Sequence, residues 1–200
     1  MILKEYLYLI DTALKYLNLD YPDIKMLEFG CQMMRFRSRP AKEYFYKKNI
    51  HKHISIDLSG KYGAQKLDLN KPITKFPNVF DISTDFGTIE HLSNQYQAFK
   101  NIHDMTRVGG YMIHALPMEG YWTTHCPYHY EPIFFYALSD CNKYSCKLNE
   151  VVPVLIRYHP EEASVNVIMK KKFNAPFISE EEFKQLKGLH FTESAKRYSF

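Results

Sequence analysis

Apolar residues along the chain follow two alternating periods. Short runs rich in β-branched and aromatic residues predict buried strands at 24–29, 53–57, 79–86 and 110–116. Helical spacing appears between them at 39–48 and 93–106, and Gly109-Gly110 is expected to stop the second helix and to open the next strand. Strands that alternate with helices indicate an α/β fold, with a parallel sheet covered by helices on both faces.

The segments outside this core extend the same plan. Near the start, one helical face carries Leu3, Leu7, Ile10, Leu14 and Leu17, which predicts a surface helix within residues 1–22. Pro132 can open a helix that runs to 142, because the first helical position needs no N–H. Two β-like runs, around 144–148 and 163–171, are expected to close the sheet. Since no linker or repeat interrupts the pattern, we predict a single domain over 1–200.

Composition and charge exclude several classes of protein. With 46% hydrophobic and 24% charged residues the chain matches a globular domain, not a disordered one. The richest apolar run is Pro132–Leu138, far too short to span a membrane, and Lys4 and Glu5 interrupt the apolar start that a signal peptide would need. The net charge of +4 is scattered apart from 170–172, so nucleic acid is an unlikely partner. The four cysteines form no CxxC pair, which favours a reducing cytoplasm.

Acidic residues and a glycine end the first two predicted strands. Glu28 and Gly30 close the first, and Asp57 closes the second. Ligands of open α/β sheets bind at this edge, where a carboxylate can accept hydrogen bonds from ribose hydroxyls. The three-glycine dinucleotide fingerprint is absent, because Gln32 and Arg35 stand at the later glycine positions. A nucleoside without a pyrophosphate therefore fits better.

Five ordered motifs carry a family resemblance. They are LEFGCQ, SIDLS, KLDLNKP, FDISTDFGTIEHL and AFKNIHDMTRVGGYMIHALP, within residues 26–117. In this order and spacing they resemble the class I S-adenosylmethionine-dependent methyltransferases. The resemblance implies a Rossmann-like fold, whose central, mostly parallel seven-stranded sheet has helices on both faces, and S-adenosyl-L-methionine as the cofactor.

The resemblance also implies the cofactor-binding residues, which lie at strand ends: Glu28, Gly30, Cys31, Asp57, Leu58, Asp68, Leu69, Asp85, Phe86, Gly87 and His91. In the family pattern Asp57 would hold the ribose hydroxyls and Asp68 the adenine amine. The segment 85–87 would lie beside the transferred methyl. Glu90-His91 matches part of a Glu-x-x-Glu-His metal constellation of some methyltransferases, but Gly87 stands where the first Glu would be. We therefore expect no metal, and a hydrogen-bonding role for this pair at a helix start.

The segment 118–131 has no clean period and is rich in aromatic residues, which predicts a long loop. We expect it to form a mobile lid whose aromatic side chains stack on the acceptor: Tyr121, Trp122, Tyr128 and Tyr130. The same loop carries His125 and His129, the candidates for a general base. Pro127 between them argues against a helical zinc pair.

These patterns predict a methyltransferase that acts on a small molecule or a sugar or glycan, at an oxygen or a nitrogen. Two other functions stay open. A nicotinamide-dependent oxidoreductase can have a similar sheet, and a non-catalytic methyltransferase-like subunit can bind the nucleoside without turnover. The missing glycines count against the first, and Glu28, Asp57 and Asp68 count against the second.

Overall fold

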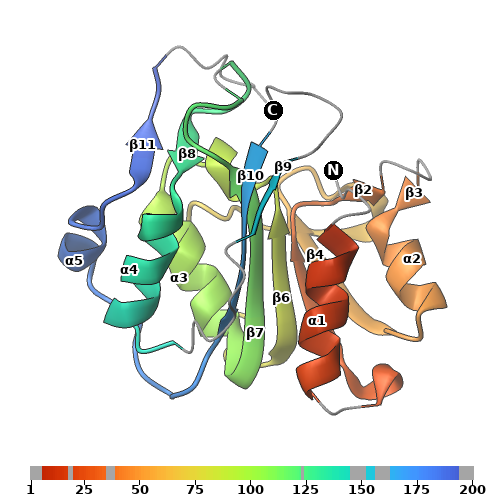
Figure 1. The fold of residues 1–200 in the computed structure, drawn as a ribbon. Coiled ribbons are helices and arrows are strands. Elements are labelled where there is room, and N and C mark those ends of the chain that lie inside the picture. Colours follow the sequence, from red (N-terminus) through yellow and green to blue (C-terminus); the bar gives the residue numbers. More distant parts are fainter. Residues whose placement is uncertain are drawn as a thin grey trace.

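The computed structural model describes residues 6–17, 20–34, 39–122, 124–144, 152–155 and 163–193. Its centre is a seven-stranded sheet in the order β5-β4-β1-β6-β7-β10-β9 (Figure 1). The strands are β1 (Lys25–Phe29), β4 (Lys52–Asp57), β5 (Gln65–Lys66), β6 (Phe80–Phe86), β7 (Thr106–Pro117), β9 (Val152–Leu155) and β10 (Ala163–Lys170). All neighbours from β5 to β7 pair in parallel, and β10 is antiparallel to both β7 and β9. The predicted α/β fold with a mostly parallel seven-stranded sheet is confirmed.

Helices cover both faces of this sheet, as the alternating pattern predicts. One face packs against α1 (Leu7–Leu17) and α2 (Ala41–Lys47), which bury Ile10, Leu14 and Phe45. The other packs against α3 (Gln95–Met105), α4 (Pro132–Cys141) and α5 (Glu180–Lys184). Figure 1 shows α1 and α2 on one side of the strands and α3, α4 and α5 on the other. Two separate apolar cores therefore hold the sheet between them.

Short elements surround this frame. The described residues include the 3-10 turns η2 (Tyr21–Asp23), η3 (Lys61–Gly63) and η4 (Ile89–His91). A small antiparallel pair joins β2 (Met33–Met34) to β3 (Arg39–Pro40), and another joins β8 (Tyr128–Tyr130) to β11 (Leu189–Phe191). None of the helices in the described part of the chain has both the length and the apolarity that a membrane crossing requires.

The N-terminal helix is rotated relative to its predicted face. Leu9 and Ala13 are buried together with Ile10 and Leu14, whereas Leu7 and Leu17 are only half-buried. Leu3 lies outside the described residues. The difference arises because the helix packs against β7 and β10, which brings the 9–13 row of its surface to the sheet.

The glycine pair 109–110 was expected to stop α3, and this prediction is wrong. The helix ends at Met105, and the Thr106 hydroxyl donates to the Ile102 carbonyl at 2.6 Å. Strand β7 begins at Thr106, so the glycines lie inside it, where its register against β6 shifts between Phe80 and Ile82. A Cβ at Gly110 would lie 2.9 Å from the Phe80 carbonyl oxygen, which explains the need for glycine at this bulge.

The closing strands were predicted in part. Strand β10 matches the run expected at 163–171. Tyr144 lies outside any strand, and residues 145–148 fall outside the described part of the chain. The edge strand is instead β9, whose Pro153 is suited to an edge position because proline cannot donate to a ladder.

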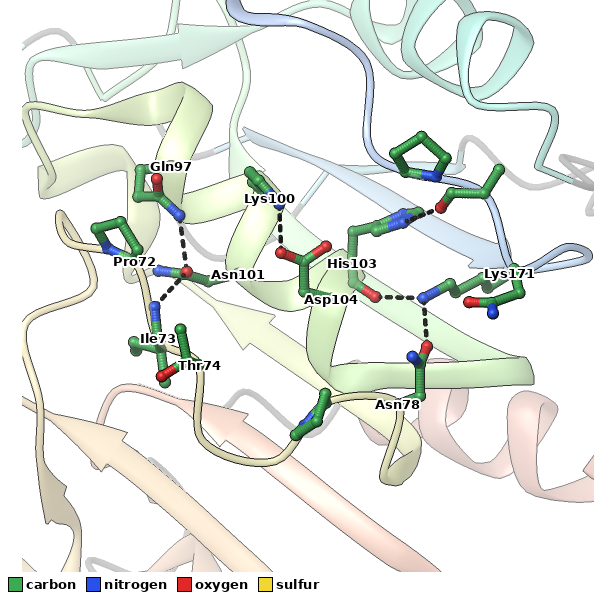
Figure 2. Close-up of a pocket in the computed structure, with 14 residues that line it drawn as sticks. Pro72, Ile73, Thr74, Asn78, Gln97, Lys100, Asn101, His103, Asp104 and Lys171 are labelled. Carbon is green, nitrogen blue, oxygen red and sulfur yellow. Dashed lines mark hydrogen bonds and ion pairs between the residues drawn. The ribbon is translucent and has the colours of Figure 1, made fainter.

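A polar network ties the C-terminal end of α3 to the end of β10. Lys171 is 2% exposed, and its ammonium group donates to Asn78 Oδ1 and to the His103 carbonyl, both at 2.8 Å (Figure 2). It also donates to the Thr106 carbonyl at 2.9 Å. The His103 ring contacts the Tyr144 hydroxyl and the Ala175 carbonyl. Burial and the Lys171 charge lower the pKa of His103 to about 4, so its ring is neutral at pH 7.

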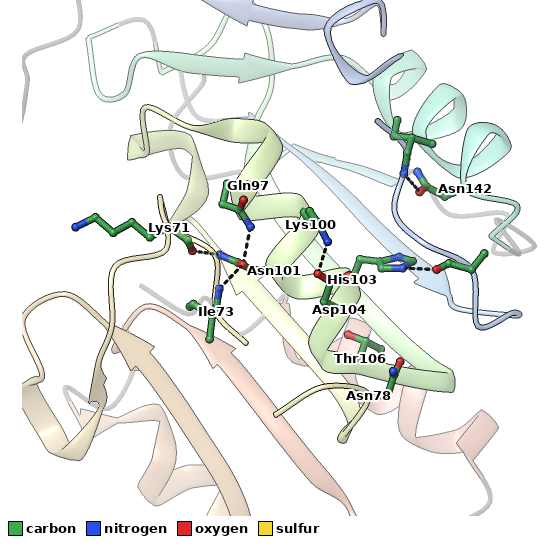
Figure 3. Close-up of polar contacts among 12 residues, drawn as sticks. Lys71, Ile73, Asn78, Gln97, Lys100, Asn101, His103, Asp104, Thr106 and Asn142 are labelled. Atoms are coloured by element: carbon green, nitrogen blue, oxygen red, sulfur yellow. Dashed lines mark hydrogen bonds and ion pairs between the residues drawn. The ribbon is translucent and has the colours of Figure 1, made fainter. Parts of the chain in front are cut away.

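Closer to the start of α3, the side-chain amide of Asn101 connects the helix to the segment that follows β5. It donates to the Lys71 carbonyl and accepts from the Ile73 N–H (Figure 3). It also donates to the Leu69 carbonyl. Asn101 and Ile73 line a cavity of about 460 Å³, together with His103 and Lys171. Since Lys171, His103 and Asn101 all use their polar atoms within the protein, we interpret this cavity as part of the scaffold.

We predict that Lys171→Met lowers the free energy of unfolding by about 2 to 4 kcal/mol, because it leaves three acceptors without their donor. Chemical denaturation followed by circular dichroism measures this loss. Lys172→Met, at an exposed neighbour, is the matched control and should change stability by less than about 0.5 kcal/mol. Equal effects of the two substitutions would show that the network contributes nothing.

Candidate functional site

A cavity of about 470 Å³ opens at the carboxyl edge of the parallel strands. Its lining comes from the segments that follow β1, β4, β5 and β6, together with one residue of the loop after β7. Of the residues predicted from the sequence it contains Gly30, Cys31, Asp57, Leu58, Asp68, Leu69, Gly87, His91 and His125. Glu28, Asp85, Phe86 and His129 do not line it.

The turn after β1 depends on Gly30. Its φ is +81°, and a Cβ built there would lie 2.4 Å from the Thr88 hydroxyl oxygen. That hydroxyl donates to the Phe29 carbonyl at 2.9 Å and accepts from the Gln32 side-chain amide at 2.8 Å. Gln32, which departs from the glycine-rich pattern, therefore links the turn after β1 to the turn after β6.

Asp57 ends β4 and closes the same turn from the other side. Its Oδ2 accepts from the Cys31 N–H at 3.0 Å, and its Oδ1 accepts from the N–H and the hydroxyl of Ser59. Partial burial raises the pKa of Asp57, but these hydrogen bonds outweigh it and hold the pKa below its usual value. The carboxylate is thus ionised at pH 7, with acceptor capacity left on Oδ2.

Asp68 lies on the segment after β5. Its Oδ1 accepts from the backbone and side-chain amides of Asn70, and Lys71 lies 3.7 Å from Oδ2. Burial raises the pKa of Asp68, but the bonds from Asn70 and the Lys71 charge together lower it. Asn70 in turn accepts from the Asn94 N–H at the start of α3. Asp68 therefore belongs to a bonded turn at the rim of the cavity.

Glu28 lies behind the cavity and is 2% exposed. Its carboxylate is 3.7 Å from His53 Nε2, too long for a hydrogen bond, and the His53 ring stacks on Phe45. Burial raises the pKa of Glu28 and lowers that of His53 to about 4. The His53 ring is therefore neutral at pH 7, and any contact of the buried Glu28 with a ligand requires a rearrangement.

Asp85 and Phe86 also lie beneath the cavity surface. The Asp85 carboxylate is fully buried, 3.2 Å from His114 Nδ1, and its other oxygen accepts from the Ile89 N–H. Phe86 stacks on Tyr6 within the core beneath α1. Only Gly87 of this predicted segment reaches the cavity. We attribute this to the burial of β6 on both faces, which turns its side chains into the two cores.

Glu90, His91 and His125 converge beside the cavity. Glu90 Oε1 is 3.6 Å from His91 Nε2, and the His91 and His125 ring centroids are 5.0 Å apart. Each residue places one possible ligand atom within 4.8 Å of the other two. Burial and the neighbouring Asp85 raise the pKa of Glu90, and burial and His125 lower that of His91 to about 4. His125, which is distant in the sequence, thus lies beside the adjacent residues Glu90 and His91.

His129 was expected to serve as a possible base, but it lies behind the loop. It is 2% exposed, and its Nε2 donates to the Trp122 carbonyl at 3.2 Å. Cys126, buried beside it, has a pKa raised by burial. Strand β8 buries both His129 and Tyr130, which separates His129 from His125 at the cavity despite their spacing in the sequence.

The loop 118–131 is anchored in its described part. Trp122 Nε1 donates to the Ala163 carbonyl, and the Glu119 N–H donates to the Tyr130 carbonyl. Tyr130, predicted to stack on an acceptor, is instead fully buried and donates to Gln95 Oε1 at 2.5 Å. The Tyr128 hydroxyl donates to the Ser93 carbonyl, and its ring packs on Phe191. The four predicted stacking residues all lie off the cavity wall.

Several cavity residues were missed from the sequence: Gln32, Ser59, Leu67, Asn70, Thr88 and Leu92. Ser59 and Asn70 each stand two residues after a predicted acidic residue, a spacing typical of side-chain-bonded turns. Thr88 gave no local signal, because its role depends on the neighbouring positions of β1 and β6.

Comparisons with known proteins find similarity only at the level of the fold. No family model matches the sequence, and no curated protein is a significant relative. Among solved structures, the 1,6-didemethyltoxoflavin-N1-methyltransferase of Burkholderia thailandensis, with bound 1,6-didemethyltoxoflavin and S-adenosylhomocysteine, aligns at TM-score 0.57 and 12% identity. The alignment covers 85% of this chain and 78% of that one. The chain thus has a methyltransferase fold.

Two further structures align less well. An S-adenosylmethionine-dependent methyltransferase from Mesorhizobium loti gives a TM-score of 0.43 at 14% identity, covering 60% of this chain and 58% of that one. The [4+2]-cyclase SpnF gives 0.36 at 15% identity, covering 58% of this chain and 50% of its own. The chain therefore spans less than two thirds of both.

We predict that Gly30→Ala lowers the free energy of unfolding by more than about 3 kcal/mol, since backbone strain adds to the clash with Thr88. Gly120→Ala is the control, because Gly120 has a similar φ of +84° with no atom within 4 Å of its Cβ position. It should cost only the strain, about 1 to 2 kcal/mol. Denaturation midpoints compare the two, and equal losses would contradict the close approach.

Proposed function

We propose that the protein is an S-adenosylmethionine-dependent methyltransferase for a small-molecule or glycan acceptor, with methylation at oxygen or nitrogen. The observation that carries the proposal is the meeting of Gly30, Asp57 and Asp68 in one cavity at the carboxyl edge of the sheet. Ligands of open α/β sheets bind at this edge. The cavity, about 470 Å³, is within the range of small-molecule sites.

The residues present fit a nucleoside. Asp57 Oδ2 accepts one hydrogen bond within the protein and can accept another from a ribose hydroxyl. Its Oδ1 already accepts twice from Ser59, so a second hydroxyl would replace that of Ser59. Asp68 Oδ2 can likewise accept a hydrogen bond from a ligand, because its ion-pair partner, the Lys71 ammonium group, lies 3.7 Å away. Leu58, Leu67 and Leu69 offer apolar contact for a flat base.

A dinucleotide fits less well. The approach of a pyrophosphate needs small residues after the first glycine, and here the Gln32 side chain spans from the turn to Thr88. This supports S-adenosylmethionine over a nicotinamide cofactor. The Burkholderia enzyme has this fold, and its solved structure contains bound S-adenosylhomocysteine. This compound is therefore a suitable probe of the cavity.

The protein's part in the reaction is to position the reactants. When bound, S-adenosylmethionine supplies a methyl group that is already activated by its sulfonium. Asp57 and Asp68 would fix the nucleoside, and the Gly30 turn would let the backbone approach it. His125 and His91 border the same cavity on the side of β6, where they would face the acceptor. His125 is thus the better candidate for the acceptor side, since His129 lies behind the loop.

We predict that S-adenosylhomocysteine binds with a Kd in the micromolar range and that Asp57→Ala weakens it by at least about 10-fold, through loss of a charge-assisted hydrogen bond. Isothermal titration calorimetry measures both, with NAD as the competing probe. Asp20→Ala, at an exposed position away from the cavity, is the control. Tighter binding of NAD, or unchanged affinity in a folded Asp57→Ala, would overturn the proposal.

We predict that His125→Asn lowers kcat by about 100-fold or more while the affinity for S-adenosylhomocysteine stays unchanged. The assay is release of S-adenosylhomocysteine with a panel of hydroxyl- and amine-bearing small molecules and sugars. His129→Asn should instead lower the melting temperature, because it disturbs buried contacts of the loop. If His129→Asn reduces kcat as strongly as His125→Asn does, the assignment of the acceptor side is wrong.

A further inference from the structure

Three side chains with metal-ligand chemistry meet in the wall of the cavity. Glu90 and His91 come from η4, and His125 comes from the loop after β7. Glu90 Oε1 and His91 Nε2 are 3.6 Å apart, close to the roughly 3.4 Å that separates two ligands of one tetrahedral metal ion. All three ligand atoms lie within 4.8 Å of one another, so a modest rotation of side chains would complete the site.

The carboxyl group of Glu90 lacks the partners that a buried polar group needs. The residue is 1% exposed, and its Oε2 is buried without a hydrogen-bond partner. Across the described ranges, neither Glu90 nor the neighbouring Asp85 pairs with a lysine or an arginine; their ion-pair partners are His91 and His114. Buried carboxyl groups are normally paired or bound to a metal, so the unbonded Glu90 Oε2 is available to a cation.

The backbone that carries Glu90 and His91 is held at both ends. The Ile89 N–H donates to Asp85 Oδ1, and the Gln95 side chain donates to the carbonyls of Ile89 and Leu92 at 2.6 and 2.8 Å. Tyr130 fixes Gln95 in turn. Ligands on so fixed a turn lose little conformational entropy on binding, which favours affinity.

His125 takes the place of a ligand that the local sequence lacks. A Cβ at Gly87 would lie 3.2 Å from Glu90 Oε1, so this glycine leaves room beside the carboxylate. The backbone N–H of His125 donates to the Trp122 carbonyl, and the His125 ring packs against the Trp122 ring. The Trp122 ring in turn donates a hydrogen bond to the Ala163 carbonyl. The loop thus brings an imidazole to the side of Glu90 and His91.

We infer that Glu90, His91 and His125 form a binding site for one divalent transition-metal cation in the cavity wall. Two imidazoles and one carboxylate suit Zn²⁺, Co²⁺ or Mn²⁺ better than Mg²⁺ or Ca²⁺, which prefer oxygen ligands. His91 and His125 line the cavity, so the open coordination positions would face it and accept an oxygen donor of the acceptor. This replaces the expectation of no metal, and its catalytic use, unlike the binding itself, rests on the proposed function.

The test is calorimetric titration of the chelator-treated protein with Zn²⁺, Mn²⁺ and Mg²⁺. We expect one Zn²⁺ per chain, with Mg²⁺ binding at least about 100-fold more weakly. Co²⁺ gives a second readout, since its visible absorption reports nitrogen and oxygen ligands in a site of low coordination number. Glu90→Gln keeps the volume of the side chain and should weaken Zn²⁺ binding by more than about 100-fold, above the loss typical of outer-shell changes.

His125→Asn should weaken Zn²⁺ binding similarly, and because its position borders the cavity it tests the site even if Glu90→Gln does not fold. His51→Ala is the control, since His51 is exposed on the chain before β4 and should leave the affinity unchanged. Absence of Zn²⁺ binding, or equal affinity in wild type, Glu90→Gln and His125→Asn, would overturn the inference.

The outcome separates this site from the proposed function. Asp57→Ala should lose S-adenosylhomocysteine and keep Zn²⁺, and Glu90→Gln should do the reverse. Binding of S-adenosylhomocysteine without Zn²⁺ would refute the metal site and leave the methyltransferase proposal intact. Zn²⁺ binding without S-adenosylhomocysteine would refute the methyltransferase proposal and leave the metal site.

Discussion

The hydroxyl of Thr88 holds together the two turns between which the cavity lies. It donates to the Phe29 carbonyl at the end of β1 and accepts from Gln32, so the turns after β1 and β6 keep a fixed separation. The contact is possible only because Gly30 has no Cβ. The other cavity groups are placed relative to this joint: Asp57 binds the Cys31 N–H, and η4 begins directly after Thr88. The close approach of Thr88 to the Gly30 backbone thus sets the geometry of the cavity at the carboxyl ends of the strands.

Buried polar groups are bonded differently at the two ends of the parallel strands. Around Lys171 the described donors and acceptors are bonded to one another, which is typical of a scaffold. Near the cavity, single atoms of Glu28, Glu90, His114 and His129 are buried with no hydrogen-bond partner. An unbonded buried polar atom costs stability, about 1 to 3 kcal/mol. Both ring nitrogens of His53 are in the same state, so this cost is not confined to one end of the strands. Glu90 directly precedes the cavity residue His91, so part of the cost falls where a ligand would bind.

Much of the fold follows from the sequence, because buried parallel strands leave continuous apolar runs. The ends of β1, β4 and β6 were predicted within a residue or two, and so was the alternation with α2 and α3. What failed depended on tertiary contacts. Gly109-Gly110 looks like a helix stop, yet it serves a bulge pressed against the Phe80 carbonyl. The burial of Leu9 and Ala13 and the inward turn of His129 were set by what α1 and β8 pack against, which periodicity does not show.

The strand order explains how one cavity can serve two chemical tasks. In the spatial strand order β5-β4-β1-β6-β7, Asp68 and Asp57 lie toward the β5 end, and the Gly30 turn lies in the middle. Glu90 and His91 follow β6. Ionised carboxylates suit hydroxyl and amine donors, whereas the neutral imidazole of His91 beside a buried carboxyl suits a cation or an acidic proton. A donor nucleoside at the first end and an acceptor at the second would therefore meet over Gly30 and Gly87, where the two glycines keep side chains out of the space between them.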